Sequence, residues 1–159
     1  MCGIIGIQNN SEAATLAYMG LYAQQHRGQE GAGVVSSDGS ELHRHMGQGL
    51  VSDVFSNPEV FNSLVGDSAI GHVRYSTTGN SDPKNVGPLT FNMGDYSLSI
   101  AHNGNITNSN ILKNELTKHG QIFQSTTDTE FILSLLSLNN KDTIEQRFVD
   151  FSSKLEGAY

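Results

Sequence analysis

The sequence predicts a layered α+β domain, and three observations support this fold class. Two-residue turns of the hairpin type, Asp38-Gly39 and Gly94-Asp95, each separate two segments rich in strand-forming residues. Segments with the helical spacing of apolar residues lie between and after these hairpins. The 159 residues suit one globular domain, so we expect residues 1–159 to fold around one core.

The chain begins with a predicted strand and a predicted helix. Residues 2–8 are mostly apolar, include two glycines, and predict a short buried strand. Ser11 can cap a helix that runs to about Gln25, and Gly28 follows as a residue suited to the helix end.

Hairpin and turn signals continue through the middle of the chain. Residues 32–37 and 40–45 predict the strands of the first hairpin. The run Asn57–Glu59 predicts a helix start, because proline after a capping residue loses no helical hydrogen bond. A strand is expected at 69–75. The polar residues 76–88 that follow it predict a structureless connection, which at this length is typically functional or mobile.

The C-terminal third predicts a hairpin and then three helices. Strands at 89–93 and 96–101 form the second hairpin, and a helix at 109–119 ends at Gly120. A helix at 128–138 opens with a capping box at Thr127–Glu130. The last helix carries apolar residues at helical spacing, with a cap and a closing glycine: Ile144, Phe148, Phe151, Leu155, Asp142 and Gly157.

The composition excludes several classes of partner. Nine Lys and Arg residues face 16 Asp and Glu residues, and the net charge of −7 without a basic cluster argues against nucleic acid or anionic lipid. No apolar run approaches the ~20 residues of a membrane helix. The single cysteine excludes an intramolecular disulfide, and the N-terminus lacks the features of a signal peptide. We therefore expect a cytoplasmic protein.

No standard cofactor motif is present, and we expect no cofactor or metal in this chain. The phosphate-loop pattern is absent, and two Gly-x-Gly runs lack the third glycine of a dinucleotide site. A site built from histidines is conceivable but less common than hydrogen-bonded or solvated histidines. The candidates are His43, His45, His72 and His102.

The one cysteine, Cys2, admits two interpretations. A lone cysteine is most often a small buried apolar residue. If Met1 is removed, however, the thiol and a free α-amine share one residue. An α-amine has a pKa of about 7.8, so it can act as the base for its own thiol, as in N-terminal threonine nucleophiles.

Four further residues could serve a thiol that attacks a carbonyl. The side chain of Asn103 and the N–H of Gly104 could stabilise an oxyanion, although an ordinary Asn-Gly turn is an equal alternative. Arg74 could bind a carboxylate and Asp128 an ammonium group, whereas singly each is more often structural. Together these groups suit glutamine or asparagine, α-amino acids with a side-chain carbonyl.

The motifs that carry these residues resemble those of a known family. The run Met1–Ile7 resembles the N-terminus of class II glutamine amidotransferases. Within that class, the amidophosphoribosyltransferase family is the one that the later runs resemble, in order: Gln25–Gly33, Gly49–Phe55, Gly71–Gly79, Ala101–Asn105 and Thr127–Glu130. The resemblance extends from Cys2 to Tyr159.

The resemblance implies a fold and a set of site residues. The fold would be the four-layer αββα sandwich of N-terminal-nucleophile hydrolases. Cys2 would be the nucleophile, and Asn103 and Gly104 would form the oxyanion hole. The residues implied to bind the substrate glutamine or lie beside the thiol are Arg74, Asp128, Arg27 and Thr77.

The resemblance also implies what the whole enzyme does. Ammonia released from glutamine would convert phosphoribosyl pyrophosphate to 5-phosphoribosylamine, the first committed step of purine synthesis. A phosphoribosyltransferase domain using Mg²⁺ would follow Tyr159, so we expect this chain to be truncated at the C-terminus, and the full-length enzyme to be a homo-oligomer. Only Met1 precedes the cysteine, so maturation would need methionine removal alone.

Two alternatives to this interpretation stay open. The chain could be the glutaminase domain of another class II enzyme such as glucosamine-6-phosphate synthase, although that family has aromatic residues at the positions of His26 and Gln29. It could instead be a catalytically silent fragment, inactive because it is truncated or retains Met1.

Overall fold

The computed structural model describes residues 1–75, 82–94, 96–138 and 143–159. The chain forms two compact units, Met1–Asn103 and Gly104–Tyr159, which we describe separately. Within the described residues, none of the helices has the length and apolar character needed to cross a membrane.

The first unit is built on a four-stranded antiparallel sheet with the order β1-β4-β2-β3. In chain order its strands are β1 Gly3–Ile7, β2 Gly31–Ser37, β3 Leu42–Gln48 and β4 Ser68–Arg74. β4 lies in the interior of the sheet, where Val73 pairs with Gly3 and Arg74 pairs with Gly31. This register brings the N-terminus of the chain and the start of β2 to the same end of β4.

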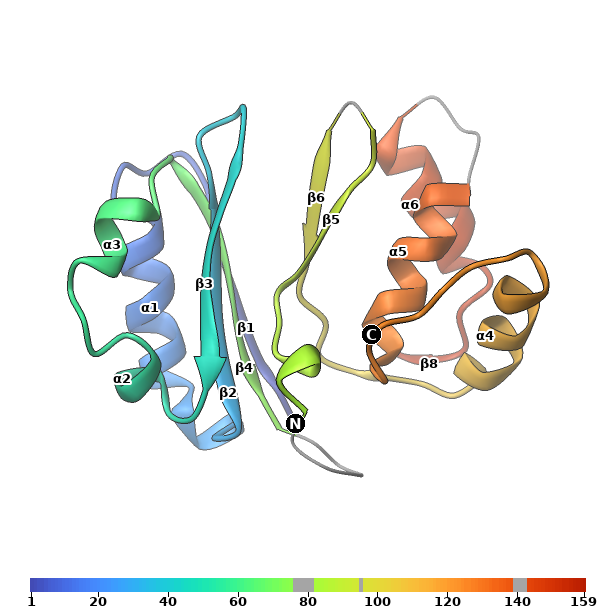
Figure 1. Ribbon diagram of the computed structural model, residues 1–159, viewed down its shortest axis with the longest axis horizontal. Helices are drawn as coiled ribbons and strands as arrows, with labels where there is room; N and C mark the ends of the chain where they lie inside the picture. The colour runs from blue at the N-terminus through green and yellow to red at the C-terminus, as the bar shows by residue number, and fades with distance from the viewer. Residues whose placement is uncertain (76–81, 95, 139–142) are drawn as a thin grey trace. The chain divides into compact units, whose positions relative to one another are not determined.

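Helices cover one face of this sheet (Figure 1). They are α1 Ala13–Ala23, α2 Val51–Val54 and α3 Val60–Ser63. Ala17 and Leu21 of α1 are fully buried in one cluster with Val34 and Val73 of the sheet. A β-carbon on Gly71 would lie 2.9 Å from Leu21, so glycine at this position lets α1 approach β4 closely.

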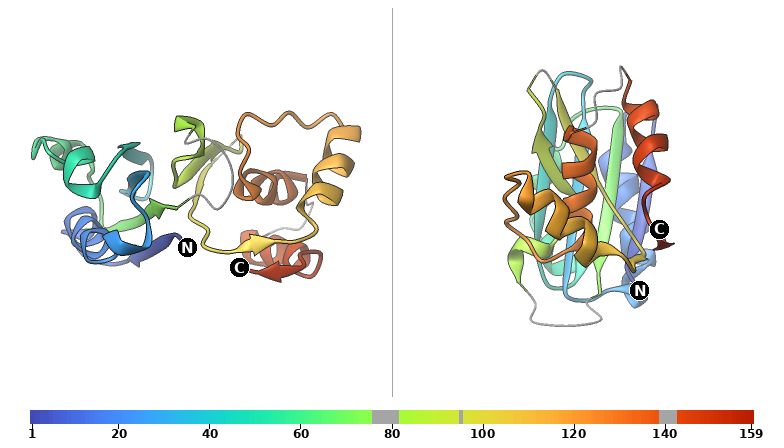
Figure 2. Two further views of the ribbon diagram at one scale, coloured as in Figure 1. Left: turned by 90° about the horizontal axis from the view of Figure 1, so that it is seen from below. Right: turned by 90° about the vertical axis from the view of Figure 1, so that its right-hand side faces the viewer.

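A second, two-stranded sheet lies on the other side of the large sheet from α1 (Figure 2). It consists of β5 Leu89–Asn92 and β6 Ser97–Ile100, and it is preceded by the 3₁₀ turn η2 Pro83–Asn85. A β-carbon on Gly33 would lie 2.5 Å from the carbonyl oxygen of Gly87, so glycine allows the segment before β5 to touch β2. The prediction of a structureless connection is therefore wrong for residues 82–88.

The second unit combines three helices with a short pair of strands. The helices are α4 Ser109–Lys118, α5 Asp128–Leu138 and α6 Ile144–Ser152. β7 Asn105–Ile106 pairs antiparallel with β8 Gly157–Ala158, so the two ends of this unit lie side by side. Leu112, Leu116, Leu133, Leu136 and Phe151 are among the buried residues of these helices.

Most predicted elements are confirmed, but several predicted helix caps are wrong. Asn10, rather than Ser11, accepts the hydrogen bond of the backbone N–H of Glu12. Glu130 does not form the predicted capping box: its carboxylate accepts the N–H groups of Gln124 and Ser125, because the preceding loop folds back onto it.

The last predicted helix and its flanks also need correction. Thr143 caps α6 by accepting the N–H of Gln146, whereas the predicted cap Asp142 lies outside the described residues. Gly157 does not close a helix, because it belongs to β8 with φ +127°. The short elements α2, β7 and β8 were not predicted, since two to four residues are too few to show a periodicity.

Candidate active site

The thiol of Cys2 lies against the backbone at the end of β4. The N–H of Tyr75 is 3.5 Å from the sulfur, and the carbonyl oxygen of Tyr75 is 3.6 Å from it. The antiparallel pairing of Gly3 with Val73 places Cys2 beside the residues that follow β4. The side chain is only partly buried, which disagrees with the interpretation of Cys2 as a buried core residue.

Arg27 holds the main chain of Cys2. Its Nε donates a hydrogen bond of 3.0 Å to the carbonyl oxygen of Cys2. Arg27 is the last residue of the 3₁₀ turn η1 Gln25–Arg27, which follows α1. The guanidinium group therefore contacts the backbone of Cys2, and its predicted place beside the thiol stays a prediction.

Gly28 brings the η1 segment onto the end of β4. A β-carbon at this position would lie 2.6 Å from both the carbonyl carbon and the carbonyl oxygen of Arg74. The N–H of Glu30 then donates to the same carbonyl oxygen over 3.2 Å. α1 ends at Ala23 and Gly28 has an extended φ of −167°, so close packing, rather than the predicted helix end, explains this glycine.

The side chain of Arg74 is largely buried, with 13% of its surface exposed. Its Nη1 donates to the carbonyl oxygen of Asn85 over 3.0 Å, and its Nε lies 3.8 Å from the carboxylate of Glu30. The interpretation of Arg74 as a solvated strand residue is therefore wrong. A guanidinium has five N–H donors, so these two contacts are compatible with binding a carboxylate as well.

His72 is a further buried residue of this region, which the sequence analysis considered only for a site built from histidines. It lies two residues before Arg74 on β4, and therefore on the same face of the sheet. Burial, together with the positive charge of Arg74, lowers the pKa of His72 from 6.5 to about 4. The imidazole is therefore neutral at pH 7. Its position in an apolar-flanked strand was the only signal in the sequence.

The second unit contains two of the predicted site residues. Asp128 is the first residue of α5, and its Oδ2 accepts the N–H of Ile106 over 3.2 Å. Ile106 follows Gly104 by two residues, so Asp128 is held to the strand that continues the predicted oxyanion motif. Its carboxylate therefore contacts β7, in addition to its favourable place at a helix start.

Asn103 and Gly104 fall on either side of the boundary between the two units. Their predicted role as oxyanion donors stays a prediction. Thr77, the remaining predicted substrate-binding residue, lies outside the described residues.

Two of the four histidines considered for a metal site have other partners. His43 pairs with Asp38 over 3.0 Å, and His45 contacts the carbonyl oxygen of Val54 over 2.8 Å. Asp38 has a pKa well below its ordinary value, chiefly because its carboxylate accepts the backbone N–H of Glu41. Across the described ranges, no group of three or more His, Cys, Asp or Glu residues is placed to hold a metal ion.

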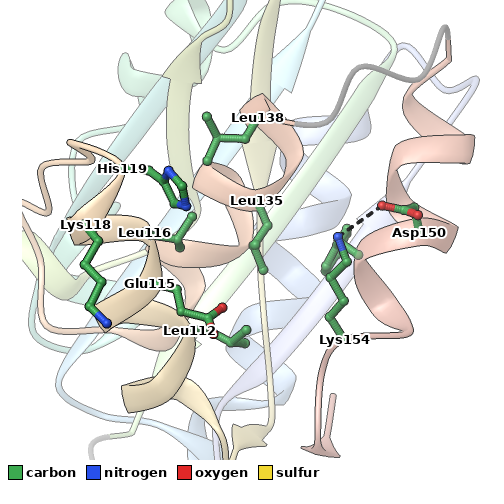
Figure 3. Close-up of a pocket in the computed structure, with 10 residues that line it drawn as sticks. Leu112, Glu115, Leu116, Lys118, His119, Leu135, Leu138, Asp150 and Lys154 are labelled. Carbon is green, nitrogen blue, oxygen red and sulfur yellow. Dashed lines mark hydrogen bonds and ion pairs between the residues drawn. The ribbon is translucent and has the colours of Figure 1, made fainter.

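The helices of the second unit line a separate cavity of about 640 Å³ that is partly open to solvent (Figure 3). Its wall includes Leu116, Leu135 and Phe151, and an ion pair of 3.4 Å between Lys154 and Asp150 lies at its edge. None of the predicted site residues lines this cavity. We therefore place the candidate active site at Cys2 and the end of β4.

Comparison with protein families assigns this chain a known domain. The model of the family described as glutamine amidotransferase domain matches residues 59–152, which is more than half of the chain. This range includes Arg74, Asn103, Gly104 and Asp128.

Curated relatives carry one common name. The chain is 45% identical over 159 residues to the amidophosphoribosyltransferase of Bacillus subtilis, covering 99% of this chain and 33% of that protein. It is 46% identical over 135 residues to the amidophosphoribosyltransferase of Lacticaseibacillus casei, covering 85% of this chain and 70% of that protein. The chain thus spans about one third of the length of the B. subtilis relative.

Solved structures share the fold. The chain superposes with a TM-score of 0.94 and 43% identity on a structure described as the allosteric regulatory enzyme of purine biosynthesis, covering 100% of this chain and 34% of that one. The TM-score is 0.91, at 42% identity, for the glutamine phosphoribosylpyrophosphate amidotransferase of B. subtilis, covering 99% of this chain and 33% of that one. These matches confirm the predicted α+β fold of the N-terminal-nucleophile type.

Proposed function

Because this chain belongs to the glutamine amidotransferase family, as the glutaminase domain of an amidophosphoribosyltransferase, we propose that it hydrolyses glutamine with Cys2 as the nucleophile. The observation that carries this proposal is the position of Cys2. Its partly exposed thiol lies at the end of β4, one residue beyond Arg74, and Arg27 holds its main chain. A nucleophile, a buried cation and a fixed backbone are thus gathered in one unit.

In the proposed reaction, the sulfur attacks the side-chain carbonyl carbon of glutamine. The α-amine of Cys2 takes the thiol proton and returns it to the departing nitrogen, which leaves as ammonia. The remaining γ-glutamyl thioester is attacked by water, which breaks the carbon–sulfur bond, releases glutamate and restores the thiol. Each tetrahedral intermediate carries an oxyanion, for which the side chain of Asn103 and the N–H of Gly104 are the proposed donors.

Arg74, Asp128, Arg27 and Thr77 are the residues proposed to bind glutamine or to lie beside the thiol, and Arg27 has the second role. Arg74 would bind the α-carboxylate of glutamine, since a guanidinium can donate two parallel hydrogen bonds to a carboxylate. Asp128 would bind the ammonium group, and Thr77 would contact the substrate from the segment that follows Arg74. Glutamine held at both charged ends presents its side-chain amide to the thiol.

The mechanism requires that Met1 be removed. With Met1 attached, the nitrogen of Cys2 is part of a peptide bond and cannot accept a proton. Met1 is 75% exposed, which suits removal by an aminopeptidase. The intact mass of the purified protein tests this step. A protein that hydrolyses glutamine while retaining Met1 would contradict the amine as the base.

The reaction of the whole enzyme is a further part of the proposal. Ammonia from this domain would displace pyrophosphate from phosphoribosyl pyrophosphate and give 5-phosphoribosylamine. We propose that Mg²⁺ assists this second reaction in a phosphoribosyltransferase domain outside this chain, and that the full-length enzyme is a homo-oligomer. The glutaminase reaction itself uses no cofactor in this scheme. A cytoplasmic location stays a prediction from the sequence.

Two experiments separate this proposal from a silent fragment. We expect a glutamine-analogue electrophile, such as a diazoketone, to label the protein once, on Cys2, as read by peptide mass spectrometry. Cys2→Ala should abolish both labelling and glutamate release, whereas the exposed substitution Gln8→Ala should leave both unchanged. Labelling elsewhere would overturn the assignment of Cys2. An unlabelled, inactive protein with Met1 removed would favour the silent fragment.

A further inference from the structure

We propose that Gln25 is a positioning residue for the nucleophile, acting through Arg27. This inference rests on the proposed role of Cys2. Gln25 is the first residue of η1, and Arg27 is the last. Because Arg27 holds the carbonyl oxygen of Cys2, whatever fixes the η1 turn also fixes the residue that carries the thiol.

Both ends of the Gln25 side-chain amide are engaged. Its Nε2 donates to the carbonyl oxygen of Gly28 over 2.6 Å, and its Oε1 accepts the N–H of Val51 over 2.7 Å. The two groups that it contacts belong to different elements, which are the end of the η1 turn and the start of α2. The side chain therefore ties these two elements together.

The contact with Gly28 closes the η1 turn from both sides. The N–H of Gly28 donates to the carbonyl oxygen of Gln25 over 3.2 Å, and the side chain of Gln25 donates back to the carbonyl oxygen of Gly28. A turn with both hydrogen bonds has little freedom to rotate the peptide groups between them. Arg27 lies inside this closed turn, so its backbone direction is set.

The contact with Val51 anchors the turn to the rest of the unit. The first N–H groups of a helix have no partner within the helix. The residue before α2 is Leu50, whose side chain cannot accept a hydrogen bond. The amide oxygen of Gln25 accepts the N–H of Val51 instead, and so acts as the cap of α2. Val51 is fully buried in the core, so Gln25 connects the turn to the packed core of the first unit.

A charge substitution tests the donor at Gly28. In Gln25→Glu, one carboxylate oxygen can still accept from Val51, but the other oxygen faces the carbonyl of Gly28 without a proton. A protonated carboxyl can again donate a hydrogen bond to the carbonyl oxygen of Gly28. Because this bond stabilises the protonated form, the pKa of the introduced carboxyl is raised. We therefore expect glutaminase activity relative to wild type to be lowest at pH 8 and to rise as the pH falls to 6.

A second substitution removes both contacts. We expect Gln25→Leu to lower kcat roughly tenfold, because the free energy of about one buried hydrogen bond corresponds to a factor of about ten in rate. KM for glutamine should change less than about twofold. The side chain of Gln25 hydrogen-bonds to Gly28 and Val51 rather than to Arg74, which is why KM should hold. The same change of amide to carboxylate at the exposed Gln8, as Gln8→Glu, is the matched control and should show wild-type kcat at every pH.

A double-mutant cycle tests whether the effect passes through Arg27. If it does, the double variant Gln25→Leu with Arg27→Lys should lose no more kcat than Arg27→Lys alone. Additive losses, unchanged kcat in both Gln25 variants, or a pH-independent loss that follows only the melting temperature would each overturn the proposal.

Alkylation distinguishes failure of this inference from failure of the proposed function. Iodoacetamide reacts with an accessible thiol whether or not glutamine is a substrate. We expect faster alkylation of Cys2 in Gln25→Leu than in wild type, because the thiol is released from Tyr75. If the wild type fails to hydrolyse glutamine, the proposed function fails, and the alkylation rates alone decide the positioning role. Equal rates would then overturn it.

Discussion

The Nη1 group of Arg74 donates a hydrogen bond of 3.0 Å to the carbonyl oxygen of Asn85. Asn85 is 3% exposed and belongs to the turn that precedes β5. The proposed carboxylate-binding residue therefore also fastens the segment that links the two sheets of the first unit. One side chain thus supports both the predicted substrate contact and the local fold.

Arg74→Ala should weaken glutamine binding more than it slows the chemical step. Loss of a charge-assisted hydrogen bond costs about 1.5–3 kcal/mol, so we expect KM to rise by roughly 10- to 100-fold. Steady-state kinetics over a range of glutamine concentrations, up to saturation, separate KM from kcat. An unchanged KM would show that Arg74 does not hold the carboxylate. A lower melting temperature is expected in addition, from the lost contact with Asn85.

Gly28→Ala should be strongly unfavourable. The added β-carbon would meet backbone atoms of Arg74 at 2.6 Å, and backbone cannot move aside as a flexible side chain can. We expect the free energy of unfolding to fall by about 1–3 kcal/mol, measured by urea denaturation. Gly6→Ala is the matched control, because a β-carbon there meets no atom within 4 Å. Equal stability of the two variants would contradict this close approach.

His72 should make the stability of the protein depend on pH. Its pKa is about 4 in the folded state and near 6.5 in the unfolded state, so the unfolded state binds more protons between these values. The free energy of unfolding should therefore rise with pH from about 4 to 6.5, with a contribution of roughly 3 kcal/mol from this residue.

A variant without a titratable group at this position isolates the effect of His72. In His72→Gln, the part of the rise in the free energy of unfolding between about pH 4 and 6.5 that comes from His72 should disappear, as measured by urea denaturation at several pH values. If both proteins show the same pH dependence, the carboxylates rather than His72 are responsible.

Asn103→Ala should lower kcat, because the amide is a proposed oxyanion donor. Removal of one such donor typically costs about 10²- to 10³-fold in kcat with little change in KM. Asn105→Ala, two residues along the chain, is the control: its backbone pairs with β8, and that pairing does not need the side chain. A smaller loss in Asn103→Ala than in the control would remove Asn103 from the proposed oxyanion hole.

Glu130→Ala should destabilise the second unit. The carboxylate is 2% exposed and accepts three hydrogen bonds, from the N–H of Gln124 and from both the N–H and the hydroxyl of Ser125. Truncation leaves buried donors unpaired, and we expect a loss of about 2–4 kcal/mol in the free energy of unfolding. Glu115→Ala, on α4, should lower the free energy of unfolding far less. Similar losses in the two variants would contradict a buried network at Glu130.

The sequence predicted the long elements well because their patterns extend over several residues. The strand at 69–75 and the hairpin turn at Asp38-Gly39 agree with β4 and with the β2–β3 pair. Local hydrogen bonds were harder to predict. Ser11 is a good cap by type, but α1 begins at Ala13 after Glu12 without a side-chain cap, and the N–H of Glu12 is accepted by Asn10.

The long-range contacts of the site could not be predicted from the sequence. Nothing near Gln25 indicates that its partner is Val51, because the contact arises when α2 folds back against the sheet. The burial of Arg74 likewise depends on Glu30 and Asn85, which lie far from it in the chain. Cys2 was identifiable because its chemistry depends on its place at the start of the chain.

The antiparallel pair β7–β8 affects where a purification or imaging handle can be attached. Ala158 pairs with Asn105, and the hydroxyl of Tyr159 donates to the carbonyl oxygen of Ser152. A fusion at the C-terminus would therefore disturb the pairing of β8 with β7, the strand that begins next to Gly104. A fusion at the N-terminus would block the amine of Cys2. The exposed turn around Gly39, where a β-carbon meets no atom within 4 Å, offers an internal position for an epitope.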